Sequence, residues 1–223
     1  MTIVVPSRTS PELVEILAQL DKLVAGKRDL RGDTRERILD VAIQSFAREG
    51  FTGTSVRKLS GPLGITPAGL YSHFASKEEI MGAALARSYR RFLEYVFLSE
   101  GGKPDTELNI LSLLRRHMEF QLRFRDTSSA TDQLLALFTA EAYIEAQTLA
   151  LIRQAQRLYF NRVRNAIAQE RGASALDVSL EAEAVLSLCD SVSAGPRVKP
   201  EREPEELIDS YLVIIRRMLT LNP

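Results

Sequence analysis

The sequence predicts an all-α protein, with a small helical unit near its N-terminus and a larger helical domain after it. Apolar residues recur three and four positions apart along most of the chain, which is the period of an amphipathic α-helix. No segment shows the alternation of apolar and polar residues that is typical of a half-buried β-strand. One stretch, residues 59–74 (LSGPLGITPAGLYSHF), gathers prolines and glycines between two long helical segments.

The first predicted helix covers residues 11–25. Ser10 is a good N-cap, Pro11 suits the first helical position, and Gly26 can end the helix. The apolar residues of this segment lie at helical spacing: Leu13, Ile16, Leu17, Leu20 and Val24. The pattern leaves three placements open, namely packing on the following helices, exchange onto a partner subunit, and free movement.

The second predicted helix covers residues 34–49, and Gly50 ends it. A basic connector, GKRDLRGD, precedes it. Its buried stripe is predicted from five apolar residues: Ile38, Leu39, Ala42, Ile43 and Phe46.

A short helix is predicted next, starting at Thr54 or Ser55, either of which can cap it. Val56 and Leu59 form its buried side. Pro62 lacks a backbone N–H and disfavours helical angles at Gly61, so we expect the helix to end near residue 60.

A tight turn and a second short helix follow. Gly64 permits a left-handed turn, Thr66 caps the helix, and Pro67 occupies its first position. Leu70 and Phe74 share one face of the helix and are predicted to enter the core. A short helix, a glycine turn and a capped helix together indicate a helix–turn–helix motif.

Five further segments are predicted as helical. Ser76 and Glu79 form a capping box at the start of the first of them. In the second, Leu108, Leu111, Met118 and Leu122 are expected on one side. The third is too long for one ordinary helix, and we expect a bend between residues 142 and 146. The segments are residues 76–99, 103–124, 131–172, 177–192 and 204–221, with a loop before the last one.

The composition is that of a globular domain of 223 residues, with 45% hydrophobic and 26% charged residues. No apolar run approaches the roughly 20 residues that a membrane span needs, and the first residues do not resemble a secretory signal. Cys189 is the single cysteine, which excludes an internal disulfide and a cysteine-rich zinc site. We expect it to be an inert buried thiol.

Charge is unevenly distributed although the formal net charge is zero. Between Lys27 and Lys77, nine basic residues stand against five acidic ones, a net charge of +4. This excess lies where an element that binds a polyanion would need it, although a mixed-charge surface in contact with water would also explain it.

The segment from Thr34 to Ile80 resembles the DNA-binding region of TetR-type transcriptional regulators. The matching elements are ILDVAIQSFAREGF, TSVRKLS, LGIT and GLYSHFASKEE, in the same order and spacing, over about a fifth of the chain. Residues 1–30 lie outside the resemblance and are predicted as an N-terminal extension, and residues 31–91 are predicted as the DNA-binding domain, with its motif at about 54–73. The resemblance also implies a ligand-binding and dimerisation domain at 92–223.

By this resemblance, DNA contacts are expected from the start of the first motif helix, from the reading helix and from phosphate-binding side chains. In that order they are Thr54, Ser55 and Arg57; Thr66, Pro67, Ala68 and Gly69; and Tyr71, His73 and Lys77.

The reading helix departs from the family pattern at Pro67 and Gly69, where a polar or basic residue and a threonine are common. It offers no Arg, Lys, Asn or Gln for bidentate recognition of a base. We therefore expect specificity to depend on phosphate register, DNA shape and Arg57, with minor-groove contacts from Arg28 and Arg31.

Apolar and aromatic residues of the larger domain are candidates for an effector cavity, although such residues more often form plain core. The candidates are Met118, Phe120, Phe124, Phe138, Tyr143 and Tyr159. An apolar or acyl-type effector would suit them. Four arginines suit either an anionic ligand such as an acyl thioester or a helix face in water: Arg115, Arg116, Arg123 and Arg125.

The last two predicted helices carry a broad apolar face that fits a dimer interface between two copies of the chain. One short reading helix makes too little contact alone, so two copies are expected on a two-fold-related operator. The interface residues are predicted as Ala184, Leu188, Leu207, Tyr211, Leu212, Ile215 and Met218.

These features predict a homodimeric cytoplasmic repressor that a small molecule releases from a palindromic operator, with no cofactor and no metal. The plain reading face keeps an alternative open, a helical ligand-binding protein that has lost DNA binding. An enzyme is disfavoured, because the sequence has no nucleophile–base pair, glycine-rich phosphate loop or metal-ligand spacing.

Overall fold

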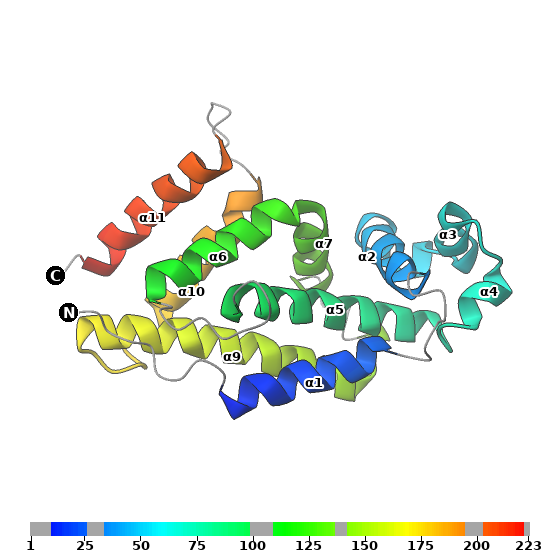
Figure 1. The fold of residues 1–223 in the computed structure, drawn as a ribbon, viewed down its shortest axis with the longest axis horizontal. Helices are drawn as coiled ribbons and strands as arrows, with labels where there is room; N and C mark the ends of the chain where they lie inside the picture. Colours follow the sequence, from blue (N-terminus) through cyan, green and yellow to red (C-terminus); the bar gives the residue numbers. More distant parts are fainter. Residues whose placement is uncertain (1–9, 26–33, 99–108, 137–141, 195–202, 221–223) are drawn as a thin grey trace. The chain divides into compact units, whose positions relative to one another are not determined.

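The computed structural model describes residues 10–25, 34–98, 109–136, 142–194 and 203–220 (Figure 1). The predicted all-α class is confirmed, because the regular elements of these residues are all helices. The α-helices are α1 (Pro11–Ala25), α2 (Thr34–Gly53), α3 (Val56–Ser60), α4 (Pro67–Tyr71), α5 (Lys77–Phe97), α6 (Ile110–Arg123), α7 (Arg125–Ala136), α9 (Ala146–Arg171), α10 (Ser179–Ser191) and α11 (Pro204–Thr220). None of these helices is both long enough and apolar enough to cross a membrane.

Two compact units make up the fold. One, which we call the helix–turn–helix unit, comprises Glu15–Arg91 and Asp126–Ala155. The other, the body unit, comprises Met1–Val14, Phe92–Arg125 and Gln156–Pro223. The predicted domain boundary between residues 91 and 92 remains a prediction, because the helix–turn–helix unit also takes up residues from the middle of the chain.

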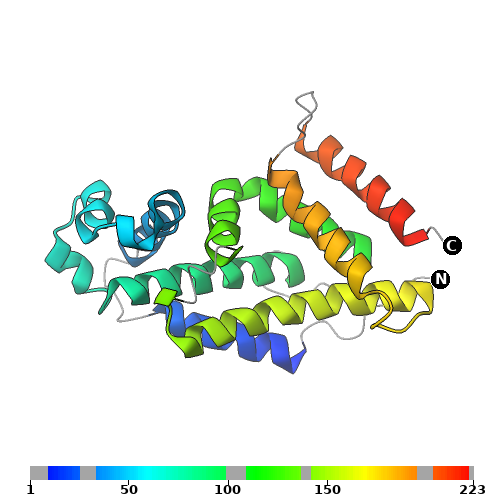
Figure 2. The same ribbon diagram turned by 180° about the vertical axis from the view of Figure 1, so that it is seen from behind.

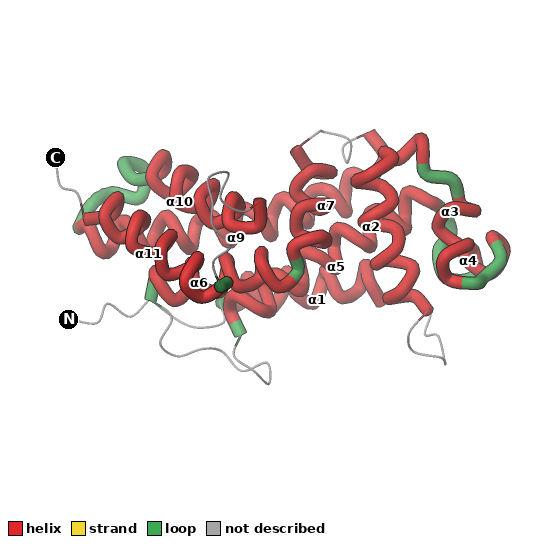
Figure 3. Tube along the Cα trace, turned by 90° about the horizontal axis from the view of Figure 1, so that it is seen from above, coloured by secondary structure: helices red, strands yellow, loops and turns green. Residues whose placement is uncertain are grey.

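The helix–turn–helix unit has a core of aliphatic and aromatic side chains from all its helices. The apolar stripe predicted for α2 is buried throughout, and the helix loses regular geometry at Gly50, where φ is 73°. α3 lies against both α2 and α4, as Figures 1 and 3 show. Leu59, Leu70 and Phe74, one from each successive segment of the motif, are 0–1% exposed. The predicted burial of Leu70 and Phe74 is confirmed.

The Pro62 prediction is half right. α3 ends at Ser60 as expected, and residues 61–63 form a single 3₁₀ turn. The expectation for Gly61 is wrong, because this residue keeps helical angles (φ −55°, ψ −55°). The proline ring excludes helical angles mainly through a clash with the preceding Cβ, and glycine has none. The chain therefore tightens after α3 without leaving the helical region until Gly64.

The first helix packs on the helix–turn–helix unit of its own chain, which is one of the three placements that the sequence left open. Ser10 caps α1 as predicted, its Oγ accepting a hydrogen bond from the Leu13 N–H at 3.2 Å. Ile16 and Leu20 are fully buried. From Glu15 onward α1 belongs to the same compact unit as α2 to α4.

The body unit packs α6, α10 and α11 against one another (Figure 2). The predicted stripe of α6 is wrong apart from Met118, because Leu111 and Leu122 are only half-buried and Leu108 lies outside the described residues. The face that packs is turned toward Ile110, Leu113, Leu114, His117 and Gln121. Periodicity alone could not locate this face, since charged and apolar residues alternate around the helix.

The long segment at 131–172 is interrupted as predicted. Ile144 and Glu145 are not helical, and α9 begins at Ala146. Most of the loop predicted between the last two helices, at residues 195–202, lies outside the described residues.

Candidate nucleic-acid interface

The helix–turn–helix motif is built by three local devices. Ser55 caps α3, its Oγ accepting a hydrogen bond from the Lys58 N–H at 3.3 Å. Gly64 has φ 67° and ψ 22°, the left-handed conformation that glycine adopts without a Cβ penalty. Thr66 caps α4, its Oγ1 accepting from the Gly69 N–H at 3.0 Å. These contacts fix where the reading helix α4 starts and the direction in which it leaves the turn.

The exposed surface of α4 is small and almost without polar side chains. Thr66, Pro67 and Ala68 are exposed, and Tyr71 is 48% exposed. The Thr66 hydroxyl is already engaged by the cap. Tyr71 therefore provides the phenol hydroxyl of this surface, where it can donate to a phosphate.

The burial of Thr54 contradicts the prediction that its side chain meets DNA. Thr54 is 0% exposed, and its hydroxyl lies 3.1 Å from the Ser45 carbonyl oxygen and 2.8 Å from that of Gly50. Its role is to close the end of α2. Ser55 and Arg57, by contrast, are exposed at the start of α3.

Lys77 holds the motif together as well as lying near its surface. Its ammonium donates to the carbonyl oxygens of Phe51, at 2.8 Å, and Thr54, at 3.1 Å, and lies 4.1 Å from the centre of the Phe51 ring. An ammonium has three donors, so one remains for a phosphate. Lys77 thus fastens the start of α5 to the end of α2.

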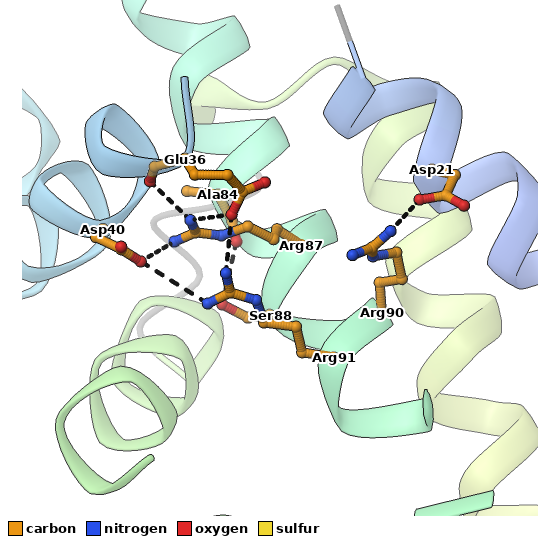
Figure 4. A network of polar contacts seen from close by, with 8 residues as sticks. All are labelled: Asp21, Glu36, Asp40, Ala84, Arg87, Ser88, Arg90 and Arg91. Atoms are coloured by element: carbon orange, nitrogen blue, oxygen red, sulfur yellow. Dashed lines mark hydrogen bonds and ion pairs between the residues drawn. The ribbon is translucent and has the colours of Figure 1, made fainter. Parts of the chain in front are cut away.

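Two arginines that the sequence did not single out are buried in the helix–turn–helix unit. Arg87 is 1% exposed, and its guanidinium contacts Glu36 at 2.8 Å and Asp40 at 2.6 Å, both on α2 (Figure 4). Arg91 shares Glu36 at 2.8 Å. The other, Arg35, is 8% exposed and lies inside the unit. The sequence could have revealed Arg35 and Arg87, because each is an arginine within an otherwise apolar helical stripe.

The basic excess of the motif is partly neutralised by ion pairs. Lys58 and Arg48 both contact Glu49. The hydrogen bond from Lys58 is the main cause that holds the pKa of Glu49 below its usual value. Of the other predicted DNA-contacting side chains around the motif, Ser55, Arg57 and Tyr71 are exposed, and His73 and Lys77 are half-buried.

The candidate effector residues do not all come together. Phe92, Phe120 and Tyr159 form edge-to-face pairs in the body unit, with ring centres 5.3 Å and 4.8 Å apart, and Phe124 lies 4.8 Å from Phe120. Met118 is buried in the same unit. Tyr143 instead belongs to the helix–turn–helix unit, where its ring stacks on that of Phe51, with the ring centres 4.2 Å apart. Phe138 lies outside the described residues.

A buried polar cluster crosses the body unit beside these aromatic rings. His117 Nδ1 lies 3.1 Å from the Tyr159 hydroxyl, and His117 Nε2 lies 2.9 Å from Asp190 Oδ1. The Gln121 amide donates to the same carboxylate oxygen at 3.0 Å. Burial, with Cys189 and Asp190 nearby, raises the pKa of Tyr159. Sequence reasoning missed this cluster because its members lie up to 73 residues apart and share no motif.

Three of the four arginines considered for an anionic ligand have contacts within the chain. Arg115 forms an ion pair with Asp209, and Arg116 donates to the Leu98 carbonyl oxygen at 3.1 Å. The Arg123 guanidinium carbon lies 5.7 Å from the centre of the Phe124 ring. Within the described residues, no group of three or more His, Cys, Asp and Glu side chains is arranged to hold a metal ion.

The predicted dimer face is only partly available. Leu207 and Ile215 are 8% and 0% exposed, because α11 packs them against the chain's own α6 and α10. The prediction for these two residues is therefore wrong. Tyr211, Leu212, Met218 and Leu188 are half-buried and Ala184 is exposed. Large apolar side chains that the sequence did not single out are exposed beside them: Leu180 at 78%, Val213 at 50% and Ile214 at 47%.

The fold and the motif define an all-helical protein with an N-terminal helix–turn–helix, and comparison with known proteins shows what this part of the chain is similar to. Residues 38–84 match the family model described as bacterial regulatory proteins, tetR family. This match covers the helix–turn–helix motif with most of α2 and the start of α5.

Relatives of known name share mainly the N-terminal part. The repressor KstR2 of Mycobacterium tuberculosis is 36% identical over 92 residues, which is 41% of this chain and 42% of that protein. The regulator AcrR of Shigella flexneri is 27% identical over 56% of each chain. The chain thus matches about half of the length of these relatives.

Solved structures extend the likeness to most of the chain. A tetR-family regulatory protein from Rhodococcus RHA1 has a TM-score of 0.66 at 19% identity, covering 84% of this chain and 97% of that one. AibR, solved with isovaleryl coenzyme A and operator DNA, has a TM-score of 0.61 at 18% identity, covering 81% and 96%. At these identities the likeness concerns the fold.

Proposed function

We propose that the protein is a DNA-binding transcriptional regulator, a homodimeric repressor that a small molecule releases from a palindromic operator. The observation that carries the proposal is the capped helix α4, which follows a left-handed Gly64 and presents Thr66, Pro67, Ala68 and Tyr71 outward. In this proposal the short helix α4 enters the major groove, and the Tyr71 phenol hydroxyl lies beside the phosphates. The protein acts in the cytoplasm, by binding rather than by turnover.

The proposed DNA contacts divide into two kinds. Ser55, Arg57, Tyr71, His73 and Lys77 bind phosphates and fix the register, because hydroxyl, phenol and cationic groups donate to phosphate oxygens. The residues of α4 contribute methyl and methylene contacts to thymine methyl groups, since none of them can form two hydrogen bonds to one base. Specificity in this proposal depends on DNA shape and on the spacing of two half-sites.

Exposed apolar side chains on α10 and α11 favour the dimer in this proposal. Leu180 of α10 and Val213 and Ile214 of α11 are large apolar side chains that the chain's own core leaves exposed. A second copy related by a two-fold axis would cover them and would bring a second α4 to the neighbouring half-site.

The effector is proposed to bind in the body unit, among the aromatic rings of Phe92, Phe120, Phe124 and Tyr159. An apolar or acyl-type ligand suits these rings. AibR, whose fold this chain shares, was solved with an acyl coenzyme A. Ligand would favour a conformation in which the two reading helices no longer fit successive major grooves.

The test is binding to DNA fragments that the purified protein selects from the genome of its source organism, measured by fluorescence anisotropy at several salt concentrations. Tyr71→Phe removes one donor and keeps the ring, so we expect about fivefold weaker binding and an unchanged melting temperature. If wild-type protein selects no fragment and shows no salt-dependent binding, the alternative stands, a ligand-binding protein that has lost DNA binding. The bare reading face is the observation that favours this alternative.

A further inference from the structure

Arg35 joins three elements of the helix–turn–helix unit through one buried guanidinium. Its Nε donates to the Val24 carbonyl oxygen, at the end of α1, at 2.7 Å. Its Nη1 donates to the carbonyl oxygen of His73, just beyond α4. Its Nη2 lies 3.7 Å from the Glu79 carboxylate at the start of α5. The guanidinium also stacks on the Phe74 ring, 3.7 Å from its centre.

The reading helix needs such external support, because α4 has only five residues. A helix this short does not hold its shape alone in water. Its first turn is fixed by the Thr66 cap and its buried side by Leu70. At its far end, the N–H groups of His73 and Phe74 converge on the Leu70 carbonyl, and Arg35 fixes the His73 carbonyl in turn.

The other end of this connection is α1, which lies outside residues 38–84 of the family match. Ile16 and Leu20 bury α1 in the unit, and Asp21 pairs with Arg90 of α5. Its Val24 carbonyl lies at the helix C-terminus, where the helix dipole favours a cation. Displacing α1 would therefore deprive Arg35 of one of its hydrogen-bond acceptors.

We propose that α1 and Arg35 position the reading helix, so that this N-terminal helix sets the affinity for DNA without having to contact it. The proposal rests on the proposed DNA-binding function. Arg35 acts here as a positioning residue, because its guanidinium is buried and its donors face the protein's own carbonyls.

The first experiment compares Arg35→Lys with Arg87→Lys in the full-length protein. Both substitutions keep the positive charge, and both remove a buried guanidinium, but the hydrogen bonds and ion pairs of Arg87 within the described residues are with Glu36 and Asp40 of α2. We expect Arg35→Lys to weaken binding to a fragment selected by wild-type protein by about tenfold and to reduce its salt dependence, because phosphate contacts are lost. Arg87→Lys should lower the melting temperature and leave the affinity of the folded protein within about twofold of wild type.

The second experiment loosens α1 without changing charge. Leu20→Ala removes a fully buried side chain of α1, and Leu134→Ala removes a buried one of α7 in the same unit, so the two serve as a matched pair. We expect Leu20→Ala alone to speed amide hydrogen exchange at His73 and Phe74 and to weaken DNA binding. This pair keeps the proposal testable if Arg35→Lys does not fold.

The outcomes separate the two proposals. If wild-type protein binds no DNA, the proposed function fails, and the exchange rates at His73 and Phe74 still decide whether α1 positions α4. If wild-type protein binds DNA and Arg35→Lys binds equally well, the positioning role is overturned. Equal effects of Leu20→Ala and Leu134→Ala on exchange and affinity would also overturn it, since both would then act through general stability.

Discussion

At the scale of single residues, Thr54 and Ser55 show how two neighbours with the same chemistry separate. Either can cap a helix, so the sequence could not assign their roles. In the structure Ser55 caps α3, while the Thr54 hydroxyl faces inward to the carbonyls of Ser45 and Gly50. The choice depends on Gly50, whose positive φ turns the chain near the end of α2. This turn buries Thr54, four positions later.

Replacing Thr54 with valine should therefore destabilise the protein. The substitution keeps the shape and removes a hydroxyl that serves two buried carbonyls, which costs about 1–2 kcal/mol of unfolding free energy. Chemical denaturation at a fixed protein concentration measures this. Thr52→Val is the control, because Thr52 is exposed, and its effect should stay below about 0.5 kcal/mol. Equal effects of the two variants would contradict the role of Thr54.

Cys189 and Tyr159 should make the free energy of unfolding fall as the pH becomes alkaline. Burial is the first cause that raises the pKa of each, so the folded protein keeps protons that the unfolded chain releases. The stabilisation is present at neutral pH and is lost as pH rises above about 8.5, the ordinary pKa of a thiol. For one thiol the loss approaches about 1.4 kcal/mol per pH unit.

Denaturation of wild type and Cys189→Ala across this range tests the prediction. The variant is less stable at neutral pH because it leaves a small cavity. Between about pH 7 and 9.5 it should lose about 1.4 kcal/mol less than wild type does. Parallel curves for the two proteins would show that Cys189 ionises equally in the folded and unfolded states.

At the scale of elements, the sequence predicted what local chemistry determines. The caps at Ser10 and Thr66 and the left-handed Gly64 were predictable, because each depends on residues within four positions. The buried face of α6 was not, because the helices that cover it come from the end of the chain. Arg35 and the His117 cluster were missed for the same reason, since their partners are 11 to 73 residues away.

The Gly61–Pro62 pair provides a test at this scale. Gly61→Ala should cost more than about 1 kcal/mol, because the added Cβ meets the proline ring while the backbone keeps helical angles. In a Pro62→Ala background the same substitution should stabilise by about 0.4–1 kcal/mol, since alanine then favours the helix. The double-mutant cycle by chemical denaturation measures this change of sign. If Gly61→Ala has the same effect in both backgrounds, the explanation given for the angles of Gly61 is wrong.

At the scale of the whole molecule, the apolar side chains that the described residues leave exposed bear on how many copies of the chain act together. Two of the seven residues predicted for the interface, Leu207 and Ile215, are turned inward, because α11 has two apolar sides and periodicity does not say which one meets a partner. The exposed side chains of Leu180, Val213 and Ile214 indicate the outer side. Such a surface is costly to leave in water, and a second copy would remove it from contact with solvent.

Placing a charge on this face should therefore separate the copies. Leu180→Arg puts an unpaired guanidinium in the proposed interface, and we expect the dimer dissociation constant to rise by about 100-fold or more. Gln169→Arg adds the same charge at an exposed position of α9 and should change nothing. Sedimentation over a range of concentrations measures both.

Because a monomer carries one reading helix, Leu180→Arg should also lose most of its affinity for a two-half-site fragment while keeping its melting behaviour at low concentration. A Leu180→Arg protein that remains dimeric at wild-type concentrations would mean that the copies meet elsewhere, and the exposed residues of α10 and α11 would need another explanation.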